Sequence, residues 1–101
     1  MTVRLLDIAE TELDEAVRYY ESQAPGLGMA FLVEFLSAVG LISDHPHAWQ
    51  SLDGEIRRCR LNRFPYGVIY TPVDGDIVVL AVGHLHRKPG HSRERLSREG
   101  D

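Results

Sequence analysis

The sequence has little cysteine and no long apolar run, and both shortages limit what the protein can be. Cys59 is the single cysteine among 101 residues, so an internal disulfide framework is excluded and a reducing compartment is expected. No stretch reaches the roughly 18 consecutive apolar residues of a membrane span. The first residues also lack the charged and then apolar pattern of a secretion signal. We therefore expect a cytoplasmic protein that has no membrane segment.

Familiar catalytic motifs are missing as well. The sequence contains no glycine-rich phosphate loop and no recognisable Ser/His/Asp arrangement. Cys59 has neighbouring arginines but no Cys-His motif, so nucleophilic catalysis by its thiol is not expected. The spacing of the cysteine and the histidines matches no zinc signature; the histidines are His45, His47, His84, His86 and His91. We expect neither a metal ion nor a cofactor.

The formal net charge of −4 conceals two different halves. Residues 1–50 carry 2 basic and 8 acidic side chains, whereas residues 51–101 carry 9 basic and 7 acidic ones. A basic region on an acidic protein can still bind phosphate or an acidic protein segment, with an affinity that falls as salt rises. The length and the 44% hydrophobic content predict one domain that spans residues 1–101.

Apolar spacing in the first half predicts a short strand and two helices. Residues 3–6 form an apolar run typical of an edge strand, and Asp7 with Glu10 resembles a capping box at the start of a helix, with Thr11 as a second candidate cap. The proline and two glycines of residues 24–28 predict a turn before a second helix. That helix is expected to end just before Pro46. Two helices joined by a short turn make an antiparallel hairpin.

The second half supplies the sheet that the helical hairpin needs to cover. Strands are predicted over residues 55–61, 66–71 and 77–82, with Asp74 and Gly75 as a hairpin turn between the last two. The run 77–82 is apolar throughout, which indicates a strand buried on both faces. We therefore predict an α+β fold in which an N-terminal helical hairpin packs on a small, twisted, mainly antiparallel β-sheet.

Basic side chains lie at the ends of these predicted strands. We expect the sheet to gather them with Tyr66 on one surface suited to an anion; they are Arg57, Arg58, Arg60, Arg63, His84, His86, Arg87 and Lys88. A competing interpretation pairs the arginines with Asp53, Glu55 or the acids of the first helix. Similarly, His84 and His86 suit either acid-base chemistry or plain hydrogen-bonded surface positions. The tyrosine pair Tyr66 and Tyr70 fits core packing, with the phenols at the rim.

The order of these residues along the chain resembles one family over roughly residues 3–95. The features that carry the resemblance run from the first predicted helix to the end of the last strand: Tyr19, Tyr20 and Glu21; Gly26, Leu27, Gly28 and Phe31; Pro46, Trp49, Arg57 and Arg58; Phe64, Pro65 and Tyr66; Ile69 and Tyr70; His84, Arg87 and Pro89. Together they closely resemble the RelE/ParE toxins of type II toxin-antitoxin systems, which include plasmid stabilisation proteins. The resemblance implies a growth-arresting toxin and a cognate antitoxin that wraps it.

The resemblance leaves two targets open. RelE-like members cleave messenger RNA on the ribosome, whereas ParE-like members poison DNA gyrase without being nucleases. For RNA cleavage, Arg58, Arg60 and Arg87 are the candidates for charge stabilisation, and His84 or His86 for the acid or base. Arg57, Arg63, Tyr66 and Lys88 are then candidates for binding a partner or nucleic acid. A third reading is a degenerate, non-toxic member that only binds an antitoxin.

Two departures from the nuclease pattern bear on this choice. Nuclease members commonly carry an arginine three residues before the strand tyrosine, and here Gly67 stands three residues before Tyr70. The basic C-terminal stretch also lacks the tyrosine that some nuclease members use. A metal-independent ribonuclease and a gyrase inhibitor that is not an enzyme therefore both remain open.

Overall fold

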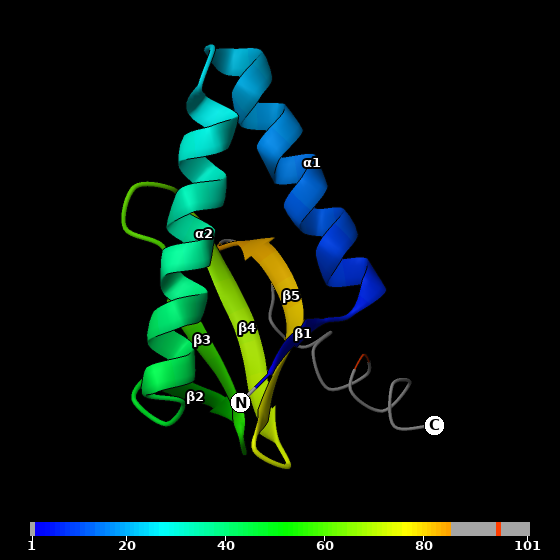
Figure 1. Cartoon of the computed structure of the whole chain (residues 1–101), viewed down its shortest axis with the longest axis vertical. Helices are drawn as coiled ribbons and strands as arrows, with labels where there is room; N and C mark the ends of the chain where they lie inside the picture. Colours follow the sequence, from blue (N-terminus) through cyan, green and yellow to red (C-terminus); the bar gives the residue numbers. More distant parts are fainter. Residues whose placement is uncertain (1, 86–94, 96–101) are drawn as a thin grey trace.

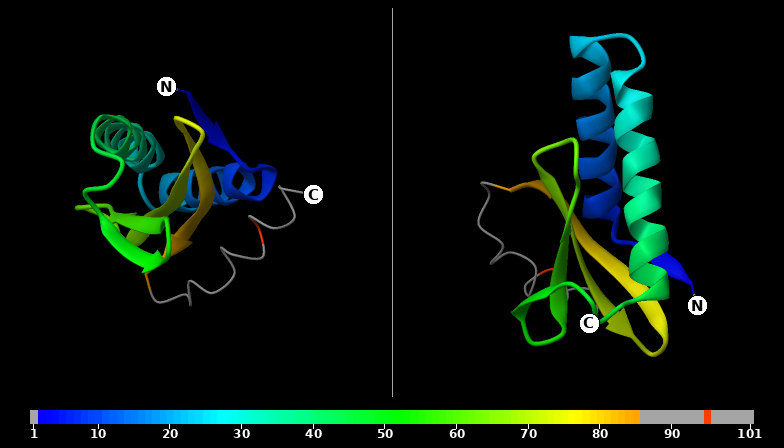
Figure 2. Two further views of the ribbon diagram at one scale, coloured as in Figure 1. Left: turned by 90° about the horizontal axis from the view of Figure 1, so that it is seen from below. Right: turned by 90° about the vertical axis from the view of Figure 1, so that its left-hand side faces the viewer.

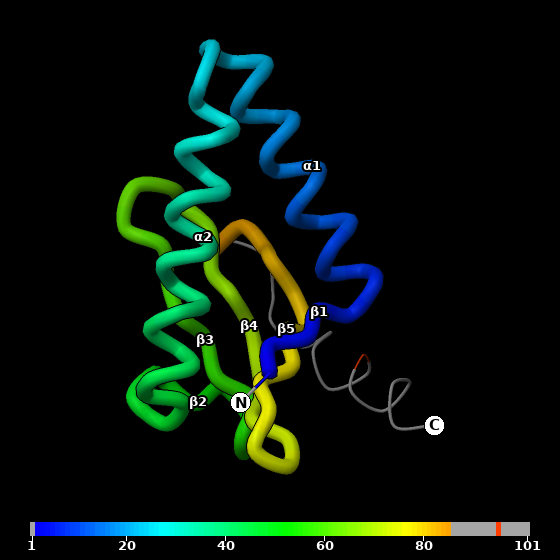
Figure 3. The backbone as a smooth tube through the Cα atoms, viewed as in Figure 1, coloured from blue at the N-terminus to red at the C-terminus, as the bar shows by residue number. Residues whose placement is uncertain are grey.

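The computed structural model describes residues 2–85 and Arg95, which form two helices and a five-stranded sheet. The helices are α1 (Asp7–Gln23) and α2 (Leu27–Asp44). The strands are β1 (Val3–Leu5), β2 (Gln50–Asp53), β3 (Ile56–Arg60), β4 (Tyr66–Val73) and β5 (Asp76–His84). Both helices lie on one side of the twisted sheet, and the turn between them projects beyond it (Figure 1; Figure 2; Figure 3). The predicted α+β architecture is confirmed.

The sheet has the strand order β1-β5-β4-β3-β2. Strands β2 to β5 pair antiparallel through short connections, and β1 pairs parallel with β5, so the sheet is mixed. Positive φ angles of 51° at Asp74 and 84° at Gly75 make the tight turn that the sequence predicted between β4 and β5. The run from Ile77 to Val82 is buried; α1 packs on one face of β5, and β1 and β4 flank it within the sheet.

The start of α1 differs from the predicted capping box. The main-chain N–H of Leu6 still donates to the carbonyl of Val79, so the chain is paired with β5 until the helix begins. Leu6 is the N-cap, no side chain caps the helix, and Asp7 is the first helical residue. Asp7 and Glu10 instead place their carboxylates in the first turn, where the helix dipole favours negative charge.

The Glu21 carboxylate and Gly28 hold the two helices together near the turn of the hairpin. Glu21 accepts hydrogen bonds from the main-chain N–H groups of Gly26 and Gly28, at 3.1 and 3.0 Å, and so satisfies the start of α2 from the end of α1. A Cβ atom at Gly28 would lie 2.6 Å from the carbonyl oxygen of Val17. The two helices therefore approach closely here because residue 28 has no side chain.

The core lies between the helices and one face of the sheet. An aromatic cluster forms its end nearest the turn of the hairpin, with the Phe31 ring 5.0 Å from Phe64 and 5.1 Å from Tyr66. Among the described residues, α2 is the helix with the length and hydropathy of a membrane-crossing segment, with a mean hydropathy of 1.7 over 18 residues. Core helices pass the same test, and α2 buries one side against the sheet.

Candidate functional site

The arginines of β3 are divided between the two faces of the sheet. Arg57 lies opposite Tyr70 on β4, whereas Arg58 and Arg60 lie opposite Ile69 and Gly67. Neighbours across antiparallel strands share a face, and successive residues alternate, so Arg57 faces the helices while Arg58 and Arg60 face away from them. We call the side away from the helices the outer face; it carries Arg58, Arg60, Gly67 and Ile69. The three arginines of β3 therefore do not share one surface.

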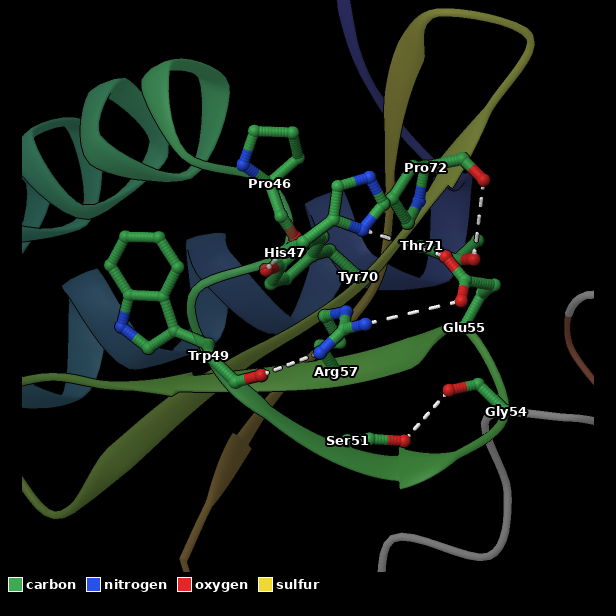
Figure 4. Close-up of polar contacts among 10 residues, drawn as sticks. All are labelled: Pro46, His47, Trp49, Ser51, Gly54, Glu55, Arg57, Tyr70, Thr71 and Pro72. Atoms are coloured by element: carbon green, nitrogen blue, oxygen red, sulfur yellow. Dashed lines mark hydrogen bonds and ion pairs between the residues drawn. The ribbon is translucent and has the colours of Figure 1, made fainter.

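Arg57 joins the segment between α2 and β2 to the sheet by a hydrogen bond. Its guanidinium donates to the carbonyl of Trp49 at 2.8 Å and lies 3.9 Å from the carboxylate of Glu55, with 17% of the side chain exposed (Figure 4). Tyr70 donates its hydroxyl to the carbonyl of Pro46 at 2.7 Å. Burial raises the pKa of Tyr70, and the charge of Arg57 partly opposes that rise. Arg57 therefore connects β3 to the segment before β2, and Glu55, which it approaches, is one of the partners that the competing interpretation named.

Arg58 lies across the outer face at Gly67. Its Cγ and Cδ atoms would be 3.0 and 3.1 Å from a Cβ atom at residue 67, and Leu85 would be 3.2 Å away. The Nε atom of Arg58 is buried and has no hydrogen-bond partner within residues 2–85 or at Arg95. Arg60 pairs with the same glycine and is exposed. The stem of Arg58 therefore fills the space in which an arginine at position 67 would begin.

His84 belongs to the side of the sheet that faces the helices. It lies opposite Tyr66 across β4 and β5, with the two rings 5.5 Å apart. The Tyr66 ring in turn packs against Tyr20 and Phe31. This arrangement confirms core packing for Tyr66 and Tyr70, and it places His84 on the face opposite to that of Arg58 and Arg60.

The remaining candidate residues lie in the loop before β4 or outside the described residues. Arg63 is exposed in the loop before β4; its main-chain N–H donates to Glu34 at 2.9 Å and its guanidinium lies 5.6 Å from the centre of the Phe64 ring. His86, Arg87 and Lys88 lie outside the described residues. No group of three or more metal-ligating side chains occurs in the part of the chain that the structure describes.

The sequence analysis did not predict one part-buried ion pair, between Glu12 and Arg95. Arg95 donates to the two carboxylate oxygens of Glu12 at 2.9 and 3.2 Å and to the carbonyl of Leu80 at 3.0 Å. Glu12 also accepts from the main-chain N–H of Val82 at 3.1 Å. The β1–β5 ladder ends at Leu5 and Val79, so these two side chains satisfy the edge of β5 beyond it. Glu12 and Arg95 are 83 residues apart, and no local pattern relates them.

Comparison with known proteins shows which family has this architecture. The family described as "ParE toxin of type II toxin-antitoxin system, parDE" matches residues 3–89. The chain belongs to the ParE toxin family. Family membership confirms the resemblance to RelE/ParE toxins and implies a cognate antitoxin as a partner. No curated protein matches the chain.

Two solved structures share the fold. The chromosomal ParDE system from P. aeruginosa contains a chain with a TM-score of 0.72 and 17% identity, over 83% of this chain and 95% of that one. The isolated E. coli RelE toxin has a TM-score of 0.52 and 13% identity, over 97% of both chains. At such identities the likeness concerns the fold of the family and not the residues of the site.

Proposed function

We propose that this ParE-family chain is the toxin of a toxin-antitoxin pair, and that it arrests growth by binding DNA gyrase in the cytoplasm without cutting RNA. The observation that carries the proposal is the division of the candidate residues between two faces. His84 lies with Tyr66 against the helices, whereas Arg58 and Arg60 lie on the outer face.

The chemistry of RNA cleavage explains why this division matters. A metal-free ribonuclease must remove a proton from the 2′-hydroxyl, stabilise negative charge on the phosphorus, and protonate the leaving oxygen. These groups must reach one phosphodiester at hydrogen-bond distance, about 2.6–3.2 Å. Side chains on opposite faces of a sheet cannot meet that requirement together. Gly67 also leaves the outer face without the cation that nuclease members commonly place there.

Binding to a protein target does not require these side chains to meet at one point. Arg60 and Arg63 are exposed, and the guanidinium of Arg58 lies on the outer face beside Arg60. Arginine is favoured at protein interfaces because its planar group binds carboxylates bidentately. The proposal therefore assigns Arg58, Arg60 and Arg63 to target contact. It gives His84 a packing role only.

Induced expression, with and without the neighbouring reading frame, tests the proposal. We expect growth arrest and a DNA-damage response, with messenger RNA left intact, and we expect co-expression of a cognate antitoxin to restore growth. The purified protein should inhibit supercoiling by gyrase. Paired Arg58→Ala and Arg60→Ala substitutions should weaken that inhibition, and the matched variant His84→Ala should retain it if the variant folds.

Two outcomes would contradict the proposal in different ways. Ribosome-dependent cleavage of messenger RNA that is lost in Arg58→Ala and His86→Ala would identify a nuclease, with the second catalytic group supplied from outside the described residues. Unchanged growth on expression, together with binding to the antitoxin, would identify a non-toxic interaction module.

A further inference from the structure

Arg58 is a part-buried cation on the outer face that no carboxylate within residues 2–85 neutralises. Its Nε atom is buried and has no hydrogen-bond partner in the part of the chain that the structure describes. Neither Arg58 nor Arg60 forms an ion pair within that part. Buried polar atoms almost always have a partner, and a bound ion or ligand is one explanation when the chain supplies none. The guanidinium of Arg58 therefore indicates a site for an anion.

The stem of Arg58 is held in one position by Gly67 and Leu85. A Cβ atom at residue 67 would lie 3.0 and 3.1 Å from Cγ and Cδ of Arg58 and 3.2 Å from Leu85, so the arginine stem fills the space that a side chain at residue 67 would need. A side chain that is already fixed loses less conformational entropy when it binds a ligand. Gly67 is thus a positioning residue for the guanidinium of Arg58.

Arg60 adds a second cation to the same face. It lies two residues further along β3, opposite Gly67, and it is exposed. Residues two apart on a strand are about 6.5–7 Å apart, so both guanidinium groups can reach neighbouring carboxylates of one segment. Gly83 lies opposite Gly67 on β5, so neither β4 nor β5 places a side chain in the row that begins at Arg60.

The charge of the molecule favours carboxylates over a phosphate backbone. The chain carries 15 acidic side chains against 11 lysines and arginines. A nucleic acid brings one negative charge with each nucleotide and is bound through a series of phosphate contacts, so an acidic protein repels it. One or two carboxylates need only the two arginines, whose planar groups bind them bidentately. We propose that the outer face binds an acidic segment of the protein target, with carboxylates on Arg58 and Arg60. The choice of a protein as the partner rests on the proposed function.

NMR titration of the purified full-length chain with a hexaglutamate peptide tests the inference. The Nε–H signal of each arginine reports on its own side chain. The peptide should shift the signals of Arg58 and Arg60 and leave that of Arg18, an exposed arginine on α1, unchanged. The affinity should fall as the salt concentration rises. Hexauridylate RNA, which carries a similar charge, should bind more weakly.

Variants separate the charge of the site from its geometry. Arg60→Ala should weaken hexaglutamate binding about two- to fivefold, the range of an exposed ion pair. Arg58→Ala should weaken it further, because its guanidinium is already held in place. The matched control Arg18→Ala removes the same charge from α1 and should leave binding unchanged. Circular dichroism would show that these variants fold.

Gly67→Ala tests the positioning role without removing a charge. Its methyl group would enter the space of the Arg58 stem, so binding should weaken. The Arg58 Nε–H signal should also shift before any peptide is added, whereas that of Arg18 should not.

Four results would overturn the inference: hexaglutamate that shifts neither outer-face signal, equal losses in Arg18→Ala and Arg58→Ala, unchanged binding by Gly67→Ala, or hexauridylate that binds more tightly through the same arginines. The gyrase proposal fails separately. A chain that inhibits supercoiling but does not bind hexaglutamate would contradict only this inference. A chain that binds the peptide through Arg58 and Arg60 but does not affect gyrase would contradict only the gyrase target.

Discussion

Alanine at two glycines of α2 should have opposite effects on stability. At Gly40 the new methyl group meets nothing within 4 Å, so Gly40→Ala should gain the helix preference of alanine over glycine. That gain is about 0.5–1 kcal/mol. At Gly28 the same methyl group would lie 2.6 Å from the carbonyl oxygen of Val17 and 2.9 Å from Cβ of Glu21. Neither atom is the end of a flexible side chain, so α1 and α2 must separate.

The magnitude of the loss at Gly28 follows from the contacts that the separation disturbs. Overpacking a close contact costs about 1–3 kcal/mol. The hydrogen bonds from Gly26 and Gly28 to the Glu21 carboxylate would also lengthen, and a bond to a charged group contributes about 1.5–3 kcal/mol. After the gain in helix preference, Gly28→Ala should lose about 2–4 kcal/mol.

Thermal and urea unfolding, followed by far-UV circular dichroism in dilute solution, measure both effects. For a domain of this size, 1 kcal/mol corresponds to about 4–8 °C in Tm. Gly40→Ala should therefore melt a few degrees above the parent, and Gly28→Ala at least about 10 °C below it. If Gly28→Ala were as stable as Gly40→Ala, the close approach of the two helices at residue 28 would be wrong.

Three further changes test other contacts. Arg95→Ala should reduce the free energy of unfolding by about 1.5–3 kcal/mol in urea titrations, because the part-buried Glu12 carboxylate loses a charged hydrogen-bond donor. The exposed control Arg60→Ala should change it by less than about 0.5 kcal/mol, and equal effects would contradict the ion pair. Tyr70→Phe should cost about 1 kcal/mol, because the Pro46 carbonyl loses its donor, and a loss near zero would place that carbonyl in water. Burial raises the pKa of the Cys59 thiol and of the Tyr70 phenol, so the folded state keeps these protons where the unfolded chain releases them. The contribution of these two groups to the free energy of unfolding should therefore be complete below about pH 8.5 and should decrease as the pH rises above it. Cys59→Ala and Tyr70→Phe should each make this decrease less steep, and an unchanged slope would contradict the assignment.

Local patterns predicted the helices and four of the five strands, including the edge strand β1 from the apolar run of residues 3–6. The turn with its proline and glycines, and the proline after α2, set the hairpin bounds, while period-two alternation and the Asp74-Gly75 turn identified β3, β4 and β5. Strand β2 was missed, because Gln50–Asp53 has no apolar alternation and becomes a strand only by pairing with β3. The cap at Asp7 was misplaced, because pairing of Leu6 with β5 decides where α1 begins.

The sequence predicted the arrangement of the candidate site less well than it predicted the fold. Alternation within β3 already separated Arg57 from Arg58 and Arg60, yet the density of positive charge suggested one surface. The structure shows which of these faces is covered by helices, and that depends on how the sheet packs and not on β3 itself.

By itself, the amino-acid sequence determined the family, the helical hairpin and the main strands, because spacing, turns and apolar periodicity are properties of neighbouring residues. Only the tertiary structure decided that Arg57 supports a loop, that Arg58 occupies the space above Gly67, and that Glu12 pairs with Arg95 across 83 positions. These contacts join residues far apart in the chain, and their partners are defined only once helices and sheet have packed together.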